Sequence, residues 1–341
     1  MLYTDDLPEA KRHGSPVFVV GCHRSGTNLL YDMLLSAGGF AIYRGYLPIY
    51  KALIPRFGSL KKTENRKRIM EVWLRSKGFR RAGLDAGRLT AKVMEECRNG
   101  GDFIRVIMGE IARDQKMPRW AVYDPDNALR IDRIKREIPN ALFVHIIRDG
   151  RDIALSLSKM GGFQPLPWDR NSRGLMATAI YWEWMVRKAQ EHGRRISSDY
   201  VEVHYEELVS DPQSALQKLG EFLEHDLNYD LIKSAGLGRL SESNSSFRDE
   251  TAHERSAPMN RWKTRLSRDE VIGIEKLVGN CLEELGYALS TSEEERKPGL
   301  REKWMRTAYR NYLEKKLWMK VNTPLGKMAS LTELDLTEEG S

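Results

Sequence analysis

Residues 17–30 read VFVVGCHRSGTNLL, and this stretch decides the fold. Four apolar residues at 17–20 lead into Gly21, and Gly26 and Thr27 then open a second apolar run with helical spacing. A short run that is apolar at every position is typical of a strand that is buried on both faces, as in a parallel sheet. The stretch therefore predicts a buried strand, a glycine loop and a helix.

The glycine loop resembles a phosphate-binding loop that lacks one part. A Walker-type loop reads G-x-x-x-x-G-K-[ST], but Thr27 takes the position of the lysine, and the cation is Arg24, three positions earlier. Such a loop still directs backbone N–H groups and the positive end of a helix dipole toward an anion. The missing lysine argues against a nucleoside triphosphatase or a small-molecule kinase. A tight strand-to-helix turn with a surface arginine is the alternative interpretation.

Other apolar runs are expected to form strands of the same sheet, at 40–43, 120–123, 141–147 and 200–205. Helical patterns lie between and after them, at 28–37, 152–160, 175–192, 212–223 and 269–286. Strands that alternate with helices are typical of α/β proteins. We therefore expect a three-layer P-loop-like fold, in which helices flank a central parallel sheet.

Composition narrows the classes of ligand. The chain has 341 residues, a net charge of +7 and a hydrophobic fraction of 41%, so a sizeable core can form and an anionic ligand, acceptor or membrane surface is favoured. No recognised nucleic-acid-binding module is present, so nucleic acid is not expected as a partner. The three cysteines are widely spaced and predict neither a disulfide framework nor a metal site. No secretory signal or run of about 20 apolar residues is present, and a cytoplasmic protein is expected.

Residues 141–156 read ALFVHIIRDGRDIALS and form a second charged stretch after a predicted strand. The strand should end at Arg148, and Asp149 or Asp152 should cap the helix that follows. Open α/β sheets bind ligands at the carboxyl ends of their strands. Ser156 lies on the same helix face as Asp149 and Asp152. The guanidinium of Arg148 at the strand end, together with the nearby hydroxyl of Ser156, suits a phosphate monoester. The alternative is that RDGRD is a solvated, self-paired charge cluster.

Together the two stretches resemble the PAPS-dependent sulfotransferase family, where PAPS is 3′-phosphoadenosine 5′-phosphosulfate. The family patterns are G-x-x-[RK]-S-G-[ST]-[TN]-L-[LM] and R-D-x-R-D-x-x-x-S. The matching residues are Gly21, Arg24, Ser25, Gly26, Thr27, Asn28, Leu29, Arg148, Asp149, Arg151, Asp152 and Ser156. The stretches 201–223, 260–270 and 285–287 are also similar to the family, so the resemblance spans residues 15–290.

The resemblance implies a sulfotransferase that moves a sulfuryl group from PAPS to a hydroxyl or amine, without a metal. The implied acceptor is a carbohydrate, lipid or peptide, and the basic chain favours an anionic one. The residues implied to bind the donor are Arg24, Ser25, Gly26, Thr27, Asn28, Arg148, Ser156 and Arg261. Of these, the loop residues would cradle the 5′-phosphosulfate, and Arg148 and Ser156 would hold the 3′-phosphate. Arg24 would also act in catalysis, by neutralising charge on the departing oxygen.

The acceptor side departs from the family pattern. Relatives with this loop place a glutamate base just beyond the second strand, but residues 40–53 contain no Asp or Glu, and Tyr46 or Leu47 stands there. Asp124 is then the candidate base, and a turn role before Pro125 is its alternative. The missing glutamate also leaves a second function open, which is a PAP- or PAPS-binding protein without catalysis.

Three regions are expected along the chain. Residues 15–290 should form the sulfotransferase-like domain, and the basic, aromatic insertion 44–119 should bind the acceptor. Residues 298–325 should form a basic amphipathic helical extension. One face of that helix carries Met305, Tyr309, Leu313, Leu317 and Val321, with Trp304, Tyr312 and Trp318 at its edges. Such a helix suits peripheral membrane contact through 301–321, and docking on the core or on a second subunit is the alternative.

Overall fold

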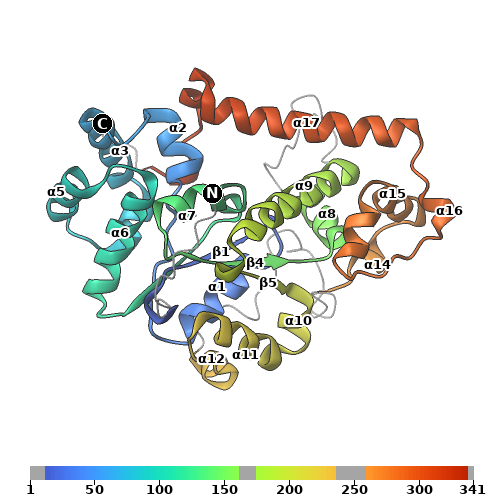
Figure 1. The fold of residues 1–341 in the computed structure, drawn as a ribbon, viewed down its shortest axis with the longest axis horizontal. Helices are drawn as coiled ribbons and strands as arrows, with labels where there is room; N and C mark the ends of the chain where they lie inside the picture. Colours follow the sequence, from blue (N-terminus) through green and yellow to red (C-terminus); the bar gives the residue numbers. More distant parts are fainter. Residues whose placement is uncertain (1–11, 161–173, 236–258, 337–341) are drawn as a thin grey trace, which may run out of the picture.

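The computed structural model describes residues 12–160, 174–235 and 259–336. Its centre is a parallel sheet with strand order β2-β3-β1-β4-β5 (Figure 1). The strands are β1 (Val17–Gly21), β2 (Phe40–Ala41), β3 (Arg119–Tyr123), β4 (Leu142–Ile147) and β5 (Tyr200–His204). Each predicted strand is present, although β2 is shorter than the apolar run 40–43. The expected α/β fold with a central parallel sheet is confirmed.

β1 is apolar at every position because helices cover both faces of the sheet. Phe18 and Val20 pack into one hydrophobic core, and Val17 and Val19 pack into the other. The first core includes side chains of α8 (Gly150–Lys159) and α9 (Leu175–Gly193), and the second includes those of α1 (Thr27–Ser36) and α11 (Pro212–Leu223). The sheet therefore lies between two helical layers, as Figure 1 shows.

The insertion between β2 and β3 is helical, which agrees with the scarcity of strand-like apolar runs in its sequence. Its elements are η2 (Ile49–Leu53), α2 (Ile54–Phe57), α3 (Thr63–Leu74), α4 (Lys77–Ala82), α5 (Ala86–Glu96) and α6 (Gly100–Asp114). Asn99 and Asp102 form a capping box that fixes the start of α6. Trp73 and Phe103 are fully buried in the same core as Phe18. The insertion is thus packed against the sheet and not a separate unit.

The remaining elements are short, apart from α15 (Arg268–Glu284), a helix of 17 residues that packs on α8 and α9. The short ones are η1 (Arg12–Gly14), η3 (Pro125–Arg130), α7 (Ile131–Glu137), η4 (Arg194–Asp199), α10 (Tyr205–Ser210), α12 (Tyr229–Ala235), α14 (Trp262–Arg265), α16 (Glu293–Arg296), η6 (Pro324–Met328) and η7 (Thr332–Leu334). Among the helices that the structure describes, none has both the length and the apolar character that crossing a bilayer requires.

The basic segment near the C-terminus forms one long helix, α17 (Leu300–Asn322), which crosses above α9 (Figure 1). Met305, Tyr309, Leu313 and Leu317 face the protein and pack against its core. Arg306 Nε donates to Glu183 Oε2 at 3.0 Å, which fixes the helix on α9. The apolar face for which the sequence suggested membrane contact therefore docks on the protein, where it packs against the core beside α9. Of that face only Val321 is exposed.

Candidate functional site

The glycine loop joins β1 to α1, as the sequence predicted. Ser25 donates both its backbone N–H and its hydroxyl to the carbonyl oxygen of Cys22, at 3.2 and 2.7 Å, and so closes the loop. Arg24 takes the left-handed conformation, with φ of 74°. This conformation is uncommon outside glycine and is concentrated at functional sites. The loop is thus tightly wound around a backbone-strained arginine.

Gly26 forms the junction between the loop and α1. Its φ is 102°, and a Cβ atom at this position would lie 2.5 Å from the ring of Tyr205, so both backbone and space require glycine. Gly26 is also the N-cap residue, and within the described chain no side chain caps α1. The first N–H groups of the helix, which include those of Thr27 and Asn28, are consequently left for a ligand.

The two predicted phosphate-binding stretches meet at the carboxyl ends of the neighbouring strands β1 and β4. Arg24 Nε donates to Ser156 Oγ at 3.2 Å, and Arg148 Nη1 donates to the carbonyl oxygen of Arg24 at 3.3 Å. The guanidinium of Arg148 also lies over the ring of Tyr205, 4.4 Å from its centroid. The structure therefore brings Arg24, Arg148 and Ser156 together around the N-terminus of α1.

The electrostatics of this cluster fit an anion. Burial and the nearby charge of Arg148 lower the pKa of Arg24 to about 10. The Nη2 atom of Arg24 is buried and has no hydrogen-bond partner among the described residues. Buried donors are normally satisfied, and two adjacent cations repel each other. A phosphate or sulfate group would satisfy the unmet donor and offset the repulsion.

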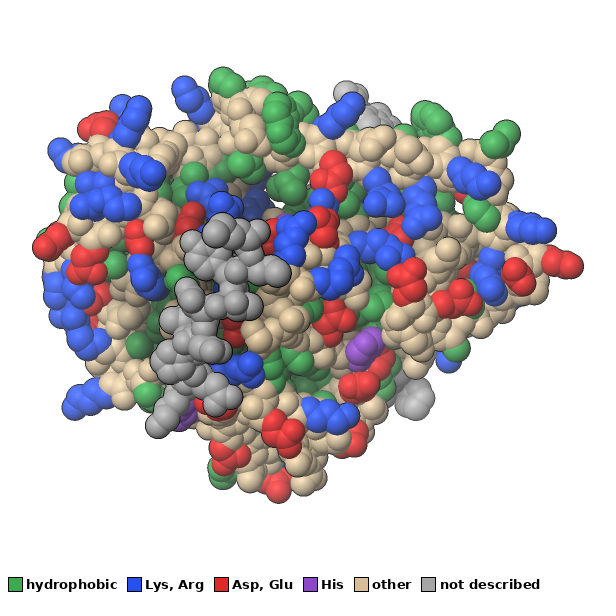
Figure 2. Space-filling model, viewed as in Figure 1, with side chains coloured by type: hydrophobic (Ala, Val, Ile, Leu, Met, Phe, Trp, Pro, Cys, Tyr) green, Lys and Arg blue, Asp and Glu red, His purple; other side chains and the backbone are tan. Residues whose placement is uncertain are grey.

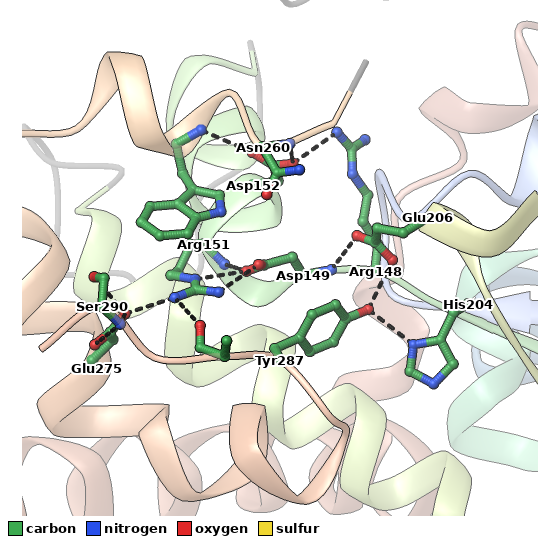
Figure 3. Close-up of polar contacts among 12 residues, drawn as sticks. Arg148, Asp149, Arg151, Asp152, His204, Glu206, Asn260, Glu275, Tyr287 and Ser290 are labelled. Carbon is green, nitrogen blue, oxygen red and sulfur yellow. Dashed lines mark hydrogen bonds and ion pairs between the residues drawn. The ribbon is translucent and has the colours of Figure 1, made fainter. Parts of the chain in front are cut away.

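The other charged residues of RDGRD form a network of hydrogen bonds and ion pairs around Arg148 (Figure 3). Asp149 caps α8 and receives two hydrogen bonds from the guanidinium of Arg151, at 3.0 and 2.7 Å. Arg151 Nη1 donates to Glu275 Oε1 of α15 at 2.7 Å, and its guanidinium lies over the ring of Trp262. Arg151 is only 2% exposed. The cluster is self-paired, as the alternative interpretation held, but it is buried and not solvated.

Asp152 fixes the backbone on both sides of Arg261, the last of the predicted donor-binding residues along the chain. Its carboxylate accepts the backbone N–H groups of Asn260 and Trp262, at 2.9 and 3.0 Å (Figure 3). Burial raises the pKa of Tyr205, and the charges of Arg148 and Arg261 oppose that rise. The charges of both arginines therefore influence the hydroxyl of Tyr205, whose ring adjoins Gly26 of the glycine loop.

The stretches at 201–223 and 285–287 supply a further layer of support. The backbone N–H of Asp149 donates to Glu206 Oε1 at 3.0 Å, and Tyr287 donates its hydroxyl to Glu206 Oε2 at 2.9 Å. The Nδ1 atom of His204 lies 3.2 Å from the same hydroxyl (Figure 3). These contacts hold the loop that carries Arg148, and they explain why the three stretches occur together.

Asp124 lies at the end of β3, next to β1, and both of its oxygens are engaged. Oδ1 accepts the N–H of Asp126 at 3.0 Å, which is the turn role, and Oδ2 accepts the hydroxyl of Tyr46 at 3.1 Å. Burial, and then the charge of Asp126, raise the pKa of Asp124 to about 6. The residue that stands near the family's glutamate position, Tyr46, thus contacts the candidate base.

Sequence analysis did not select the group around Asp126. Lys51 Nζ lies 2.6 Å from Asp126 Oδ2, and His23 Nε2 lies 3.4 Å from Oδ1. Although burial opposes it, the contacts with His23 and Lys51 hold the pKa of Asp126 well below its usual value. His23 is therefore paired and not simply solvated, and it ties the turn after β3 to the loop. Lys51, as a cation within 40–53, is the signal in the sequence from which this contact could have been predicted.

No group of three or more His, Cys, Asp and Glu side chains that could hold a metal ion occurs in the ranges 12–160, 174–235 and 259–336. The fold and site define an α/β protein with a cluster of arginines at the carboxyl ends of β1 and β4, beside the N-terminus of α1. The family model described as "Sulfotransferase family" matches residues 16–229, well over half of the chain. The chain belongs to the sulfotransferase family.

Individual relatives are distant. A "Putative protein-tyrosine sulfotransferase" of Caenorhabditis briggsae is 25% identical over 225 residues, which cover 62% of this chain and 66% of the relative. A protein of the same name from Caenorhabditis elegans is 23% identical over 164 residues, which cover 47% of this chain and 59% of the relative. The chain thus spans less than two thirds of the length of these curated relatives.

Among solved structures, the "Sulfotransferase Domain from the Curacin Biosynthetic Pathway" superposes with a TM-score of 0.51 and 18% sequence identity. The match covers 81% of this chain and 98% of that domain. At this level of identity the likeness shows the fold alone. It confirms the P-loop-like architecture that the alternation of strands and helices predicted.

Proposed function

We propose that this protein transfers a sulfuryl group from PAPS to a hydroxyl or amine of an acceptor. The observation that carries the proposal is the meeting of Arg24, Arg148 and Ser156 at the N-terminus of α1. Membership of the sulfotransferase family supports sulfuryl transfer as the reaction. The unmet donor of Arg24 and the uncapped helix support an anionic donor such as PAPS.

The donor-binding residues are proposed in two groups. Arg24, Ser25, Gly26, Thr27 and Asn28 bind the 5′-phosphosulfate, and Arg148, Ser156 and Arg261 bind the 3′-phosphate. When bound, PAPS supplies the activated sulfuryl group. Arg24 stabilises negative charge as the bond to the leaving oxygen weakens, and its buried position strengthens that effect. Ser156 orients the Arg24 side chain through its hydroxyl oxygen.

Asp124 is proposed to accept the proton of the acceptor. A pKa of about 6 leaves its carboxylate ionised at neutral pH and still basic enough to receive a proton. The hydroxyl of Tyr46 donates to Oδ2 and so orients the carboxylate. Lys51 forms an ion pair with the neighbouring Asp126, which partly offsets the negative charge that Asp126 places beside Asp124.

The insertion 44–119 is proposed to bind the acceptor, since it contributes Tyr46 and Lys51 to the acceptor side. Candidate acceptors are a carbohydrate, a lipid or a peptide, preferably anionic. The names of the two nematode relatives favour a peptide. A cytoplasmic location is part of the proposal, because the three cysteines are buried free thiols, which suit a reducing compartment.

The second candidate function is PAP or PAPS binding without catalysis, and the absence of an acid in 40–53 favours it. One experiment separates the two. Cell extract is incubated with the protein and PAPS, and molecules that gain the mass of one SO₃ group are sought by mass spectrometry, with Arg24→Ala as the control. The proposed function predicts such a gain with the parent alone. PAP binding without any gain would establish the second candidate.

A further inference from the structure

The face of α17 that points away from the protein is apolar toward both ends. Trp304 and Trp318 are 72% and 60% exposed, although the helix around them is docked on α9. At 3.6 residues per turn, Leu300, Trp304 and Trp318 fall on one side of the helix. Figure 2 shows hydrophobic side chains along the edge of the molecule where α17 runs.

Exposed apolar side chains are concentrated on this segment. Within the described ranges, eight large hydrophobic residues are exposed, and the six that lie on α17 or η6 are Leu300, Trp304, Trp318, Val321, Leu325 and Met328. Isolated exposed apolar residues need no explanation, but a concentration of them marks an interaction surface. We refer to these six residues as the outer apolar set.

Positive charge surrounds the outer apolar set. α17 contains seven Lys or Arg residues and two Glu. Glu314 accepts a hydrogen bond from Trp184 of α9 and pairs with Lys188, so its charge is offset on the protein side. A hollow of about 510 Å³ lies between α15 and α17, and cations outnumber acids in its lining. Its charged lining residues are Lys276, Lys303, Arg306, Arg310, Glu302 and Glu314. Lys and Arg side chains gather below the α17 edge in Figure 2.

We propose that α17 and η6 form a surface that binds membranes containing anionic lipid. Tryptophan side chains favour the boundary between lipid headgroups and acyl chains, and interleaved Lys and Arg are attracted to anionic headgroups. The helix would lie parallel to the membrane plane, with Trp304 and Trp318 inserted and the basic hollow beside them facing the headgroups. The proposal needs neither the donor nor the acceptor of the proposed reaction.

The charge of α17 favours an anionic membrane over a second copy of the chain as the partner of this surface. A symmetric contact through α17 would bring two helices together that each carry a net charge of +5. An anionic lipid surface offers the opposite charge and the apolar layer in one place. The outer apolar set therefore fits lipid better than it fits itself.

Flotation of the full-length protein with vesicles tests the proposal. Vesicles of phosphatidylcholine alone are compared with vesicles of equal parts phosphatidylcholine and phosphatidylserine, without PAPS. We expect at least about tenfold stronger binding to the second kind, since each nearby cation contributes about fivefold. The double variant Trp304→Ala, Trp318→Ala should lose at least about tenfold in affinity. Leu231→Ala is the matched control, because Leu231 is 57% exposed on α12, and it should bind like the parent.

A second pair of variants tests the charges. Lys303→Gln combined with Lys315→Gln should weaken vesicle binding by about fivefold for each charge removed. Lys67→Gln is the control, since Lys67 is exposed on α3, which is not part of the proposed surface. Quenching of the parent's tryptophan fluorescence by brominated phosphatidylcholine in the mixed vesicles gives a measurement that depends on no variant, and we expect it to occur.

Any one of four results would overturn the proposal. The parent could fail to float with the anionic vesicles, or its fluorescence could be unaffected by brominated lipid. The tryptophan variant could bind like the parent. Sedimentation could also show a dimer of the parent that the tryptophan variant loses, which would assign the outer apolar set to a second copy.

Discussion

Arg24 Nε lies 3.2 Å from Ser156 Oγ, in a hydrogen bond that joins residues 132 positions apart. Arg24 comes from the loop after β1, and Ser156 lies on the helix after β4. Because β1 and β4 are adjacent parallel strands, their carboxyl ends place both residues at one edge of the sheet. This contact turns two weak sequence patterns into one candidate donor site.

Arg24→Ala should lower turnover far more than it weakens PAP binding. Arg24 is proposed to act on the leaving oxygen, and loss of one such preorganised donor typically costs about 10²–10³ in rate. The measurement pairs steady-state kinetics with calorimetry of PAP. Equal losses in turnover and in PAP affinity would contradict the separate role of Arg24.

Ser156→Ala should weaken PAP binding by about 1 kcal/mol, the usual net contribution of one hydrogen bond. The matched control is Ser158→Ala on the same helix. The hydroxyl of Ser158 donates to the carbonyl of Leu155, so its removal should not affect PAP. If both variants bind PAP alike, Ser156 does not belong to the donor site.

Asp124 should give kcat/KM an acidic limb near pH 6. Its ionised form is the proposed base, so activity should fall as pH drops below its pKa of about 6 and level off above it. Asp124→Asn should remove this limb and lower turnover by about 10²–10⁴, with unchanged PAP affinity. Normal turnover in the variant would leave Asp124 with its turn role alone.

The same raised pKa predicts a pH dependence of stability. The folded state holds the Asp124 proton more tightly than the unfolded state, where the pKa is 3.8. The stabilisation from this group is complete below pH 3.8 and is lost as pH rises toward 6. The melting temperature of Asp124→Asn should therefore improve relative to the parent between pH 4 and pH 7. A constant difference across this range would contradict the raised pKa.

Tyr46→Phe should move the acidic limb of kcat/KM to higher pH. The Tyr46 hydroxyl stabilises the ionised carboxylate of Asp124, so its loss should raise the pKa of that carboxylate further. The comparison of parent and variant pH profiles tests this positioning role. An unmoved limb together with lower turnover would give Tyr46 a different role.

Much of the fold could be predicted because β1 and β4 are apolar throughout, and only a sheet covered on both faces buries such strands. The roles within RDGRD could not be separated in this way. Only the strand end and the family resemblance singled out Arg148 as the phosphate ligand, and no local pattern predicts that Arg151 pairs with Glu275, 124 residues away. Asp124 and Lys51 likewise acquire their partners only when the insertion folds against β3. Such pairings depend on packing that local patterns do not encode.

The C-terminal helix α17 is a second case in which local sequence patterns do not predict packing. Spacing correctly placed Met305, Tyr309, Leu313 and Leu317 on one face. Spacing alone could not show whether α9 or a lipid surface covers that face, since both are apolar. The structure gives the apolar stripe to α9 and leaves the tryptophans outside.

Calorimetry of PAP with the parent and with Arg148→Ala tests whether the two sequence stretches form one donor site. Arg148 joins both stretches, and loss of a charge-assisted fork to a buried phosphate should cost about 2–4 kcal/mol. The control is Arg68→Ala on the surface of α3, which removes an exposed arginine far from the loop. We expect the parent and the control to bind PAP in preference to ATP, and Arg148→Ala to bind at least about thirtyfold more weakly. Equal PAP binding by all three proteins, or no PAP binding by the parent, would contradict the account.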